Sequence, residues 1–324
     1  MRARWIGSLV AMTLLAGMTV SQRPARLNPL IDLLEQKRPV FGLYAPANPR
    51  NGRGPSSGAT VQRSPLELAR AALDYENTDF LFDGSMEGDF DRGFEGYAAF
   101  VGGMAEAGQL LATPVKRLRQ PLIVKTPEIA PDPALAIDRI SRQLNLGTSG
   151  IVFVNAESAE EVRAGLAAMR FRSQGGTRPD DVGTAPSYWG LTEEEYRERA
   201  DLWPLNPRGE LVNWTIVESK EGLANVREIA AVEGIGVLFP GAGTLRRVFS
   251  STDANGNRVL DEEAWEAAIQ QVLAACKEFN VPCGYPATAE DIGQRMKQGF
   301  SVFIMGWGEQ GFDAIDTGRR LSGR

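Results

Sequence analysis

The chain has 324 residues, 43% of them hydrophobic and 23% charged, a balance typical of a globular protein. Its 41 acidic residues outnumber its 35 Lys and Arg residues, and the net charge of −6 argues against a nucleic-acid-binding protein. The chain contains no histidine, which excludes the commonest general base and a common ligand of zinc. Proton transfer would therefore fall to Asp, Glu, Lys or Tyr, and a metal would need oxygen ligands, as Mg²⁺, Mn²⁺ and Ca²⁺ prefer.

The N-terminal segment has the pattern of a signal peptide. Arg2 and Arg4 precede an apolar stretch from Trp5 to Val20, and small or polar residues follow it. The stretch is short for a membrane span, although an uncleaved anchor is the alternative interpretation. We therefore expect residues 1–21 to be removed, leaving a periplasmic or secreted protein with no stable membrane span.

Eight short apolar segments are predicted to be strands. Each is rich in Val, Ile, Leu or Phe without strict alternation, which is typical of strands buried on both faces of a parallel sheet. In chain order they are Pro39–Tyr44, Asp79–Asp83, Leu122–Thr126, Gly150–Asn155, Trp214–Ser219, Gly236–Pro240, Pro282–Tyr285 and Ser301–Gly306.

Helical segments lie between these strands. Ser64 and Ser158 are each followed by a glutamate three residues later, the pattern of a capping box at the start of a helix. The longest predicted helix is Asp261–Phe279, which has an apolar face. Further helices are predicted at Glu221–Val232, Ala289–Gln298 and Phe312–Gly318.

Strands alternating with helices predict an α/β fold, a single-domain (β/α)8 TIM barrel over residues 22–324. An open doubly wound sheet is the alternative, but no Gly-x-Gly-x-x-Gly motif follows the first strand. Two inserts interrupt the pattern, at residues 48–61 and 171–213. The first is rich in Gly, Pro and Ser, so we expect a loop there.

Cys276 and Cys283 are the only cysteines. An exported protein could join them in a disulfide. We expect two unbonded, buried side chains instead, because a pair between the end of a helix and the start of a strand needs a specific Cα spacing to bond.

The active site of a (β/α)8 barrel lies at the carboxyl ends of its strands. Polar residues at or just after the predicted strand ends are Asp83, Glu87, Asp89, Lys125, Glu128, Asn155 and Glu218. Carboxylates in such positions need a cation or hydrogen-bond donors, which a metal ion or Lys125 would supply. Structural salt bridges at the mouth of the barrel are the alternative interpretation.

Asp253–Asn257 superficially resembles the start of a calcium-binding loop. Arg258 stands where such a loop needs glycine, and Ala264 stands where it needs glutamate. We therefore expect a polar turn before the helix that begins near Asp261.

Several segments resemble motifs of the HpcH/HpaI aldolases. Met86–Glu87 resembles their second-strand motif D-M-E-H, and Gly176–Arg178 resembles their G-x-R loop. Trp214–Glu218 is similar to their metal-binding strand, and Leu238–Leu245 is similar to the region with the motif G-P-x-D-L. With Gly150–Val154 and Ala289–Val302, the resemblance extends in order over nearly the whole chain after the N-terminal segment.

In that family a Glu and an Asp hold a divalent cation that chelates pyruvate, an Arg stabilises the enolate and a His aids proton transfer. By resemblance, Glu218 corresponds to the metal-binding Glu and Thr244 to the Asp, while Lys125 corresponds to the Arg and Gly88 to the His. The resemblance implies Mg²⁺ or Mn²⁺ at Glu218, a small-molecule 2-oxo acid or hydroxy acid as substrate, and a homo-oligomer. The residues that we expect to be catalytic are Lys125, Glu87 and Asp83, and those expected to bind substrate are Gly241, Ala242, Thr244 and Arg178.

Three functions follow from these residues. The first is a metal-dependent carbon–carbon lyase that forms a pyruvate-type enolate. The second is a non-catalytic periplasmic binding protein, suggested by the replacements at Gly88, Lys125 and Thr244. The third is another reaction on the same scaffold, with Glu87 or Asp83 as base and Tyr44 or Tyr285 as proton donor. A lysine at a strand end also permits Schiff-base chemistry.

Overall fold

The computed structural model describes residues 25–48 and 62–324. The predicted signal peptide and nearly all of the first predicted insert lie outside these residues. Within the described ranges, no helix combines the length and hydropathy needed to cross a membrane.

All eight predicted strands are present, and they form one curled parallel sheet with an additional short strand at one edge. Neighbouring strands pair in the order β12, β13, β1, β2, β5, β6, β8, and β9 also pairs with β8. Their bounds are β1 (Val40–Tyr44), β2 (Phe80–Asp83), β5 (Leu122–Thr126), β6 (Gly150–Phe153), β8 (Leu211–Val217), β9 (Val237–Pro240), β12 (Gly284–Pro286) and β13 (Val302–Met305), and the additional strand is β7 (Leu202–Trp203). The two ends of the sheet approach at one isolated parallel bridge between Leu238 and Cys283.

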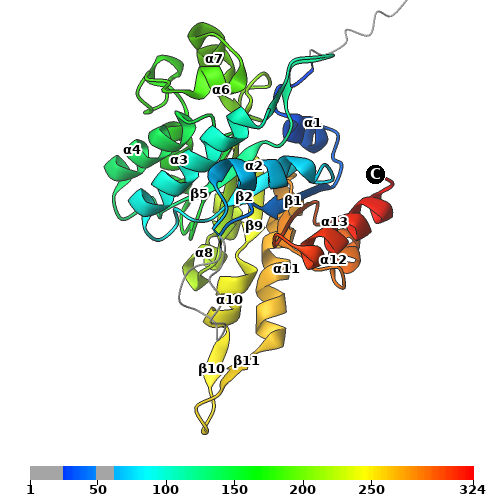
Figure 1. Ribbon diagram of the computed structural model, residues 1–324. Coiled ribbons are helices and arrows are strands. Elements are labelled where there is room, and N and C mark those ends of the chain that lie inside the picture. The colour runs from blue at the N-terminus through cyan, green and yellow to red at the C-terminus, as the bar shows by residue number, and fades with distance from the viewer. Residues whose placement is uncertain (1–24, 49–61) are drawn as a thin grey trace, which may run out of the picture.

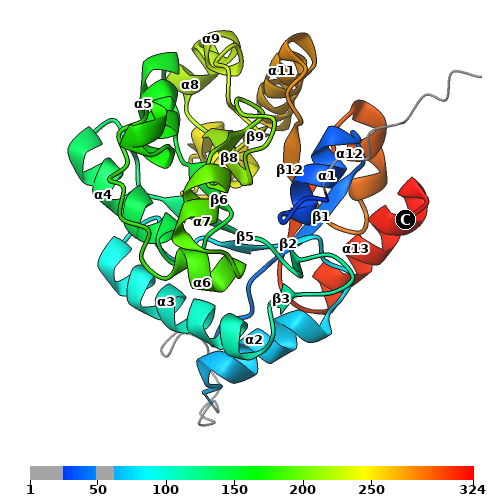
Figure 2. The same ribbon diagram turned by 90° about the horizontal axis from the view of Figure 1, so that it is seen from above.

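Helices surround the outside of this curled sheet, as the view from above shows (Figure 2). Two predicted N-caps are confirmed, because Ser64 forms a capping box with Glu67 and the Ser158 side chain accepts a hydrogen bond from the backbone of Glu161. The outer helices are α2 (Pro65–Asp74), α3 (Phe90–Glu106), α4 (Pro133–Leu144), α5 (Ala159–Met169), α8 (Lys220–Ala224), α9 (Val226–Ala230), α10 (Ala242–Val248), α11 (Glu262–Phe279), α12 (Ile292–Gln298) and α13 (Glu309–Ser322).

The prediction of one helix over Glu221–Val232 is wrong, because Asn225 separates α8 from α9. The Asn225 side chain donates to the backbone carbonyl of Glu157, 2.8 Å away, and so ties this break to the loop after β6. The turn at Asp253–Asn257 is confirmed as polar. It joins β10 (Ser250–Thr252) to β11 (Arg258–Leu260) in an antiparallel hairpin that projects from the body beside the start of α11 (Figure 1).

The second predicted insert is more regular than its sequence suggests. It contains a 3₁₀ turn (Arg172–Gln174), α6 (Ala185–Trp189), α7 (Glu193–Arg199) and β7, and it lies at the opposite end of the molecule from the β10–β11 hairpin (Figure 1). The short α1 (Pro29–Glu35) and the small hairpin of β3 (Leu110–Leu111) and β4 (Arg117–Leu118) complete the described elements.

Large rings fill the interior of the curled sheet. Trp214 packs edge-on against Phe80 and stacks with Phe239, and α1 contributes three buried side chains to the same apolar cluster. Gly42 and Gly284 make room for these rings, since a Cβ atom at either position would lie within 2.2 Å of a phenylalanine ring. The interior is therefore a packed core, and side chains that alternate with it point outward to the helices.

The disulfide corrects the expectation that the cysteines are unbonded. Cys276, in α11, and Cys283, just before β12, are bonded with their Cα atoms 5.6 Å apart, a separation that a disulfide accommodates. The left-handed Asn280 ends the helix and turns the chain back, which brings the two residues together.

We predict that Gly284→Ala destabilises the protein by about 1–3 kcal/mol, because the added Cβ would lie 1.9 Å from the Phe239 ring and overpack the interior. Urea unfolding followed by tryptophan fluorescence measures the change. Gly243→Ala is the matched control, since no atom lies within 4 Å of a Cβ at that position in α10. Equal stability of the two variants would contradict the packing argument.

Candidate active site

Lys125 and Glu87 form an ion pair at the carboxyl end of the sheet. The Lys125 Nζ lies 2.8 Å from the Glu87 Oε2, and the two side chains are 14% and 41% exposed. In β5, Ile123 belongs to the interior cluster and Val124 to the outer one, so alternation turns Lys125 inward at the mouth of the curled sheet. Glu87 reaches it from the loop between β2 and α3. The structure thus brings two of the three predicted catalytic residues together.

Glu218 follows β8 and continues the inward row of Trp214 and Ile216. Its side chain is only 6% exposed, and its Oε1 accepts a hydrogen bond of 3.1 Å from the backbone N–H of Asn155. Asn155 has a left-handed backbone, with φ of 49°, and its side chain donates to the Glu128 Oε1, 3.1 Å away. This one residue therefore positions two carboxylates.

A cavity of about 270 Å³ connects these groups. Its polar lining is Glu87, Glu128, Arg139, Asn155 and Glu218. Carboxylates from three separate loops thus face one small space, with one arginine and the neighbouring Lys125 as cations. Such a charged lining suits a small polar ligand better than a large apolar one.

Tyr44 ends β1 beside Lys125. An added Cβ at Gly84 would lie 3.6 Å from the Lys125 Cδ and 3.7 Å from the Tyr44 ring, so both side chains flank this glycine. Partial burial raises the pKa of the Tyr44 phenol; the Lys125 ammonium opposes that rise, and Glu87, Asp83 and Glu218 add to it. Tyr44 is therefore protonated at neutral pH and can donate a proton at this mouth.

Tyr285, the other predicted proton donor, has a different environment. It alternates with the inward Gly284 and packs in the outer cluster, where Arg295 donates to its hydroxyl over 3.0 Å. The structure does not bring it together with Lys125 and Glu218.

Asp83, the third predicted catalytic residue, has partners of its own. Its Oδ1 accepts hydrogen bonds from the backbone N–H and the hydroxyl of Ser85, at 2.7 and 2.5 Å. Burial raises the pKa of the Asp83 carboxyl, and the two bonds from Ser85 moderate the rise. Asp83 shapes the loop that carries Glu87, and no direct bond joins it to Lys125 among the described residues.

The predicted substrate-binding residues are not all in one place. Gly241 lies against Glu218, because an added Cβ there would be 2.6 Å from the Glu218 Oε2. Ala242 is buried at the start of α10, where its carbonyl accepts from the Trp265 indole, and the Thr244 hydroxyl accepts from Arg247. Only Gly241 therefore contacts the Glu218 carboxylate.

The structure does not bring Arg178 to the mouth. It belongs to the second insert and is fully buried there, where it lies over the Phe171 ring and donates to the side chain of Asn145 over 2.8 Å. Asn145 precedes β6, at the amino end of the sheet. The expectation that Arg178 binds substrate is corrected accordingly, because this side chain holds the insert in place.

Glu161 is a positioning residue that the sequence reasoning assigned only to a capping box. Its two carboxylate oxygens accept hydrogen bonds from the backbone of Ala130 and of Glu157, at 3.3 and 3.1 Å. It therefore ties together the loops after β5 and β6, which carry Glu128 and Asn155. In the sequence, only its position in the first turn of a predicted helix sets Glu161 apart, and that position does not predict its bonds to two loops.

The donor set at the mouth does not fit a divalent cation in this arrangement. Among residues 25–48 and 62–324, no three acidic or cysteine side chains gather around a common point suited to a metal. The Glu218 carboxylate accepts a hydrogen bond from the backbone N–H of Asn155, and the Thr244 hydroxyl accepts one from Arg247. Glu87 forms an ion pair with the Lys125 ammonium. The cation predicted at Glu218 has one candidate ligand there, and the positive charges at the mouth come from Lys125 and Arg139.

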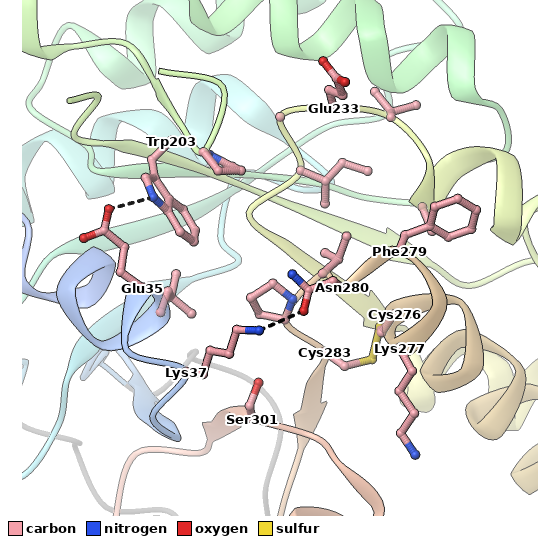
Figure 3. Close-up of a pocket in the computed structure, with 18 of the residues that line it drawn as sticks. Glu35, Lys37, Trp203, Glu233, Cys276, Lys277, Phe279, Asn280, Cys283 and Ser301 are labelled. Atoms are coloured by element: carbon pink, nitrogen blue, oxygen red, sulfur yellow. Dashed lines mark hydrogen bonds between the residues drawn. A yellow bond between two sulfur atoms is a disulfide. The ribbon is translucent and has the colours of Figure 1, made fainter. Parts of the chain in front are cut away.

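A larger cavity, of about 860 Å³, lies at the amino end of the sheet (Figure 3). Two hydrogen bonds join polar groups of its lining: the Trp203 indole donates to Glu35, and Lys37 donates to Asn280. The disulfide lines the same wall. These bonds and the disulfide give the lining of the larger cavity a structural role. We therefore take the smaller cavity, at the carboxyl end of the sheet, as the candidate active site.

The sequence pattern of the HpcH/HpaI aldolase/citrate lyase family matches residues 114–315. The chain belongs to this family. Among curated relatives, it is 30% identical over 174 residues to 2-dehydro-3,6-dideoxy-6-sulfogluconate aldolase from Pseudomonas putida, covering 53% of this chain and 61% of the relative. It is 26% identical over 174 residues to 5-keto-4-deoxy-D-glucarate aldolase from Salmonella gallinarum, covering 51% and 59%. The match thus spans about three fifths of these relatives.

Solved structures of HpcH/HpaI proteins share the fold. An HpcH/HpaI aldolase/citrate lyase family protein from Burkholderia cenocepacia matches with a TM-score of 0.63 and 20% identity, over 91% of this chain and 98% of that one. A citrate lyase beta subunit from M. tuberculosis, complexed with oxaloacetate and magnesium, matches with a TM-score of 0.51 and 14% identity, over 89% and 99%. At these identities the likeness establishes the curled α/β architecture of this HpcH/HpaI protein.

For this HpcH/HpaI chain we predict that Asn155→Ala is less stable than Asn155→Gly by about 1 kcal/mol, because only glycine adopts the left-handed backbone without strain. Both variants lose the bond to Glu128, so their difference in urea unfolding isolates the backbone cost. An alanine variant as stable as the glycine variant would contradict the strain at this position.

We also predict that Ser85→Ala raises the pKa of Asp83 further, since it removes a hydrogen bond to the charged carboxylate. A raised pKa means that Asp83 favours the folded state below its unfolded pKa and that this contribution is lost as pH rises through the folded pKa. Carboxyl ¹³C titration by NMR measures the shift, and Ser251→Ala, on the exposed hairpin, is the control. A fall in the pKa would show that the hydroxyl does not stabilise the charge.

Proposed function

We propose that this protein is a carbon–carbon lyase that cleaves or forms a bond next to the carbonyl of a small 2-oxo acid or hydroxy acid. The observation that carries the proposal is the Lys125–Glu87 pair at the mouth of the sheet, beside the buried Glu218. The two curated relatives named above are both aldolases, and their names support the same class of reaction.

Aldol chemistry needs an electron sink at the carbonyl and a group that moves a proton at the neighbouring carbon. In this proposal Lys125 is the cation that draws electrons toward the carbonyl oxygen. Glu87, 2.8 Å from Lys125, accepts or returns a proton, and Tyr44 donates one. Arg139 and Glu218 line the small cavity. In this proposal Arg139 orients the carboxylate of the acid, and Glu218, which accepts from the backbone N–H of Asn155, faces its hydroxyl groups.

A divalent ion such as Mg²⁺ or Mn²⁺ remains the expectation from the sequence, with Glu218 as its ligand. Because the described donor set does not fit such an ion, the proposal assigns every role to side chains of this chain. Titration with Mn²⁺ followed by paramagnetic relaxation of water tests the ion directly, with Glu218→Gln as the comparison.

We propose further that the curled sheet closes into a single-domain (β/α)8 barrel. The bridge between Leu238 and Cys283 supports closure, as does the 3.0 Å bond from the Leu238 N–H to the Pro282 carbonyl. Export to the periplasm or the medium, and assembly into a homo-oligomer, stay predictions from the N-terminal sequence and from the family.

The second candidate function is a binding protein that has lost turnover. It is favoured by the hydroxyl of Thr244 facing Arg247 where the family has a metal-binding carboxylate, and by glycine at position 88. A binder would be stabilised by a 2-oxo acid without transforming it.

Exchange of the pyruvate methyl protons for deuterium, followed by NMR, separates the two functions. We expect exchange by the wild-type protein and a loss of about 100-fold or more in Lys125→Met, because removing a preorganised charge at the carbonyl costs that much. Lys297→Met, on the exposed side of α12, is the matched control and should keep the wild-type rate. Reactions with EDTA and with added Mg²⁺ or Mn²⁺ run in parallel. Thermal stabilisation by pyruvate with no exchange under any condition would favour the binding protein and contradict the lyase.

A further inference from the structure

We propose that Lys125 is a Schiff-base lysine, whose Nζ forms a covalent imine with the carbonyl carbon of the 2-oxo acid. The inference rests on the proposed function and specifies how Lys125 draws electrons from the carbonyl. The family resemblance does not supply it, because the residue at this position in the family is an arginine, which cannot form an imine.

The first support is the position of the amine. Lys125 projects inward near the carboxyl end of β5, and its backbone carbonyl accepts a hydrogen bond of 2.8 Å from the side chain of Gln143. Its Nζ has one hydrogen-bond partner in the described part of the chain, Glu87. The other two N–H groups have no partner among the described residues and can bond to water or to a ligand.

The second support is that the nearest group can take the proton that blocks attack. An ammonium is not a nucleophile, so it must lose a proton before it reacts. Glu87 lies 2.8 Å away and is partly exposed, so it can relay that proton to water or to the carbonyl oxygen as the amine attacks, although the ion pair itself favours the ammonium.

The third support is the charge around the amine. The cavity beside Lys125 contains the carboxylates of Glu87, Glu128 and Glu218, and Glu218 forms no ion pair within the described residues. Carboxylates close to an iminium ion stabilise its positive charge. They stabilise the ammonium of the free lysine as well, so Glu87 must accept the ammonium proton before the imine forms.

The steps balance without any redox partner. Glu87 takes a proton from the Lys125 ammonium, and the amine lone pair forms a C–N bond at the carbonyl carbon. The resulting hydroxyl leaves as water, with the proton returned by Glu87, and an iminium remains. In the cleavage direction, the Glu87 carboxylate removes the proton of the C4 hydroxyl, the C3–C4 bond breaks, and its electron pair moves onto the iminium as an enamine while the aldehyde leaves.

The cycle closes with a proton and a water molecule. Tyr44 stands beside Lys125 as a proton donor, and protonation of the enamine at C3 regenerates an iminium. Water adds to its carbon, the C–N bond breaks, and pyruvate leaves with the lysine restored. Glu87 gives the proton from the C4 hydroxyl to Tyr44, and hydrolysis of the iminium leaves Lys125 as the ammonium, so the protein ends as it began.

Borohydride trapping tests the inference. The full-length protein is incubated with pyruvate and EDTA, reduced with sodium borohydride, digested and analysed by mass spectrometry. We expect one adduct with the mass of pyruvate less one oxygen, on the peptide that contains Lys125. Lys125→Arg and Lys125→Met should lack it, while Lys297→Met should keep it.

A rescue experiment adds a readout that a structural role would not produce. Both natural cysteines are in the disulfide, so Lys125→Cys introduces one free thiol, which bromoethylamine converts to a lysine-like amine. We expect both the adduct and methyl exchange to be absent before this treatment and to return after it. Lys125→Arg, which keeps the charge, should show neither.

The outcomes separate this inference from the proposed function. Methyl exchange by the wild-type protein without an adduct on Lys125, or an adduct spread evenly over exposed lysines, would overturn the Schiff base and leave the lyase standing. An adduct on Lys125 without exchange would support the covalent site and contradict the lyase. Exchange retained in Lys125→Met would overturn both assignments of Lys125.

Discussion

The alternation of side chains along short strands around a ring-filled interior is the constraint on which the rest of this structure depends. Trp214, Phe80 and Phe239 occupy the space within the curled sheet. The glycines at positions 42 and 284 leave room for the phenylalanine rings, because they carry no Cβ atom. Each strand must then keep a fixed register, because a shift of one residue would exchange its inner and outer side chains. The same register carries Tyr44, Lys125 and Glu218 to the inner face at the carboxyl end, so packing of the core also positions the chemistry.

The two ends of the sheet differ in what their side chains do. At the amino end, Arg178 holds the second insert and the disulfide fastens α11 to the start of β12. At the carboxyl end, Glu87 and Glu218 face a small cavity beside Lys125, and Lys125 pairs with a single partner among the described residues. Stabilising contacts and reactive groups are thereby separated along one axis, which is the usual division in barrels of this kind.

The strands could be predicted from the sequence because a strand buried on both faces leaves a continuous apolar run, and all eight such runs form strands. The helix α3 could not, since four glycines interrupt its pattern; two of them, Gly93 and Gly103, are required where the helix meets the backbone of Ser85 and Pro65. The position of Lys125, Glu87 and Glu218 at the carboxyl end of the sheet could be predicted, because each lies at or just after the end of a strand. The separate environments of Arg178, Asp83 and Tyr285 could not, because loop positions and the outward face of β12 follow from tertiary packing.

The packed interior also decides how molecules enter and leave. Within the described residues, aromatic rings and the side chains of α1 fill the axis of the sheet, so a small acid would reach the candidate site from the end that carries Lys125. In the proposed cleavage, two fragments that share this entrance would leave in sequence, with the fragment farther from Lys125 leaving first. An aldehyde would then leave before the oxo acid and bind after it. This order of binding and release would follow from the stacked rings of Trp214 and Phe239, which fill the interior of the sheet.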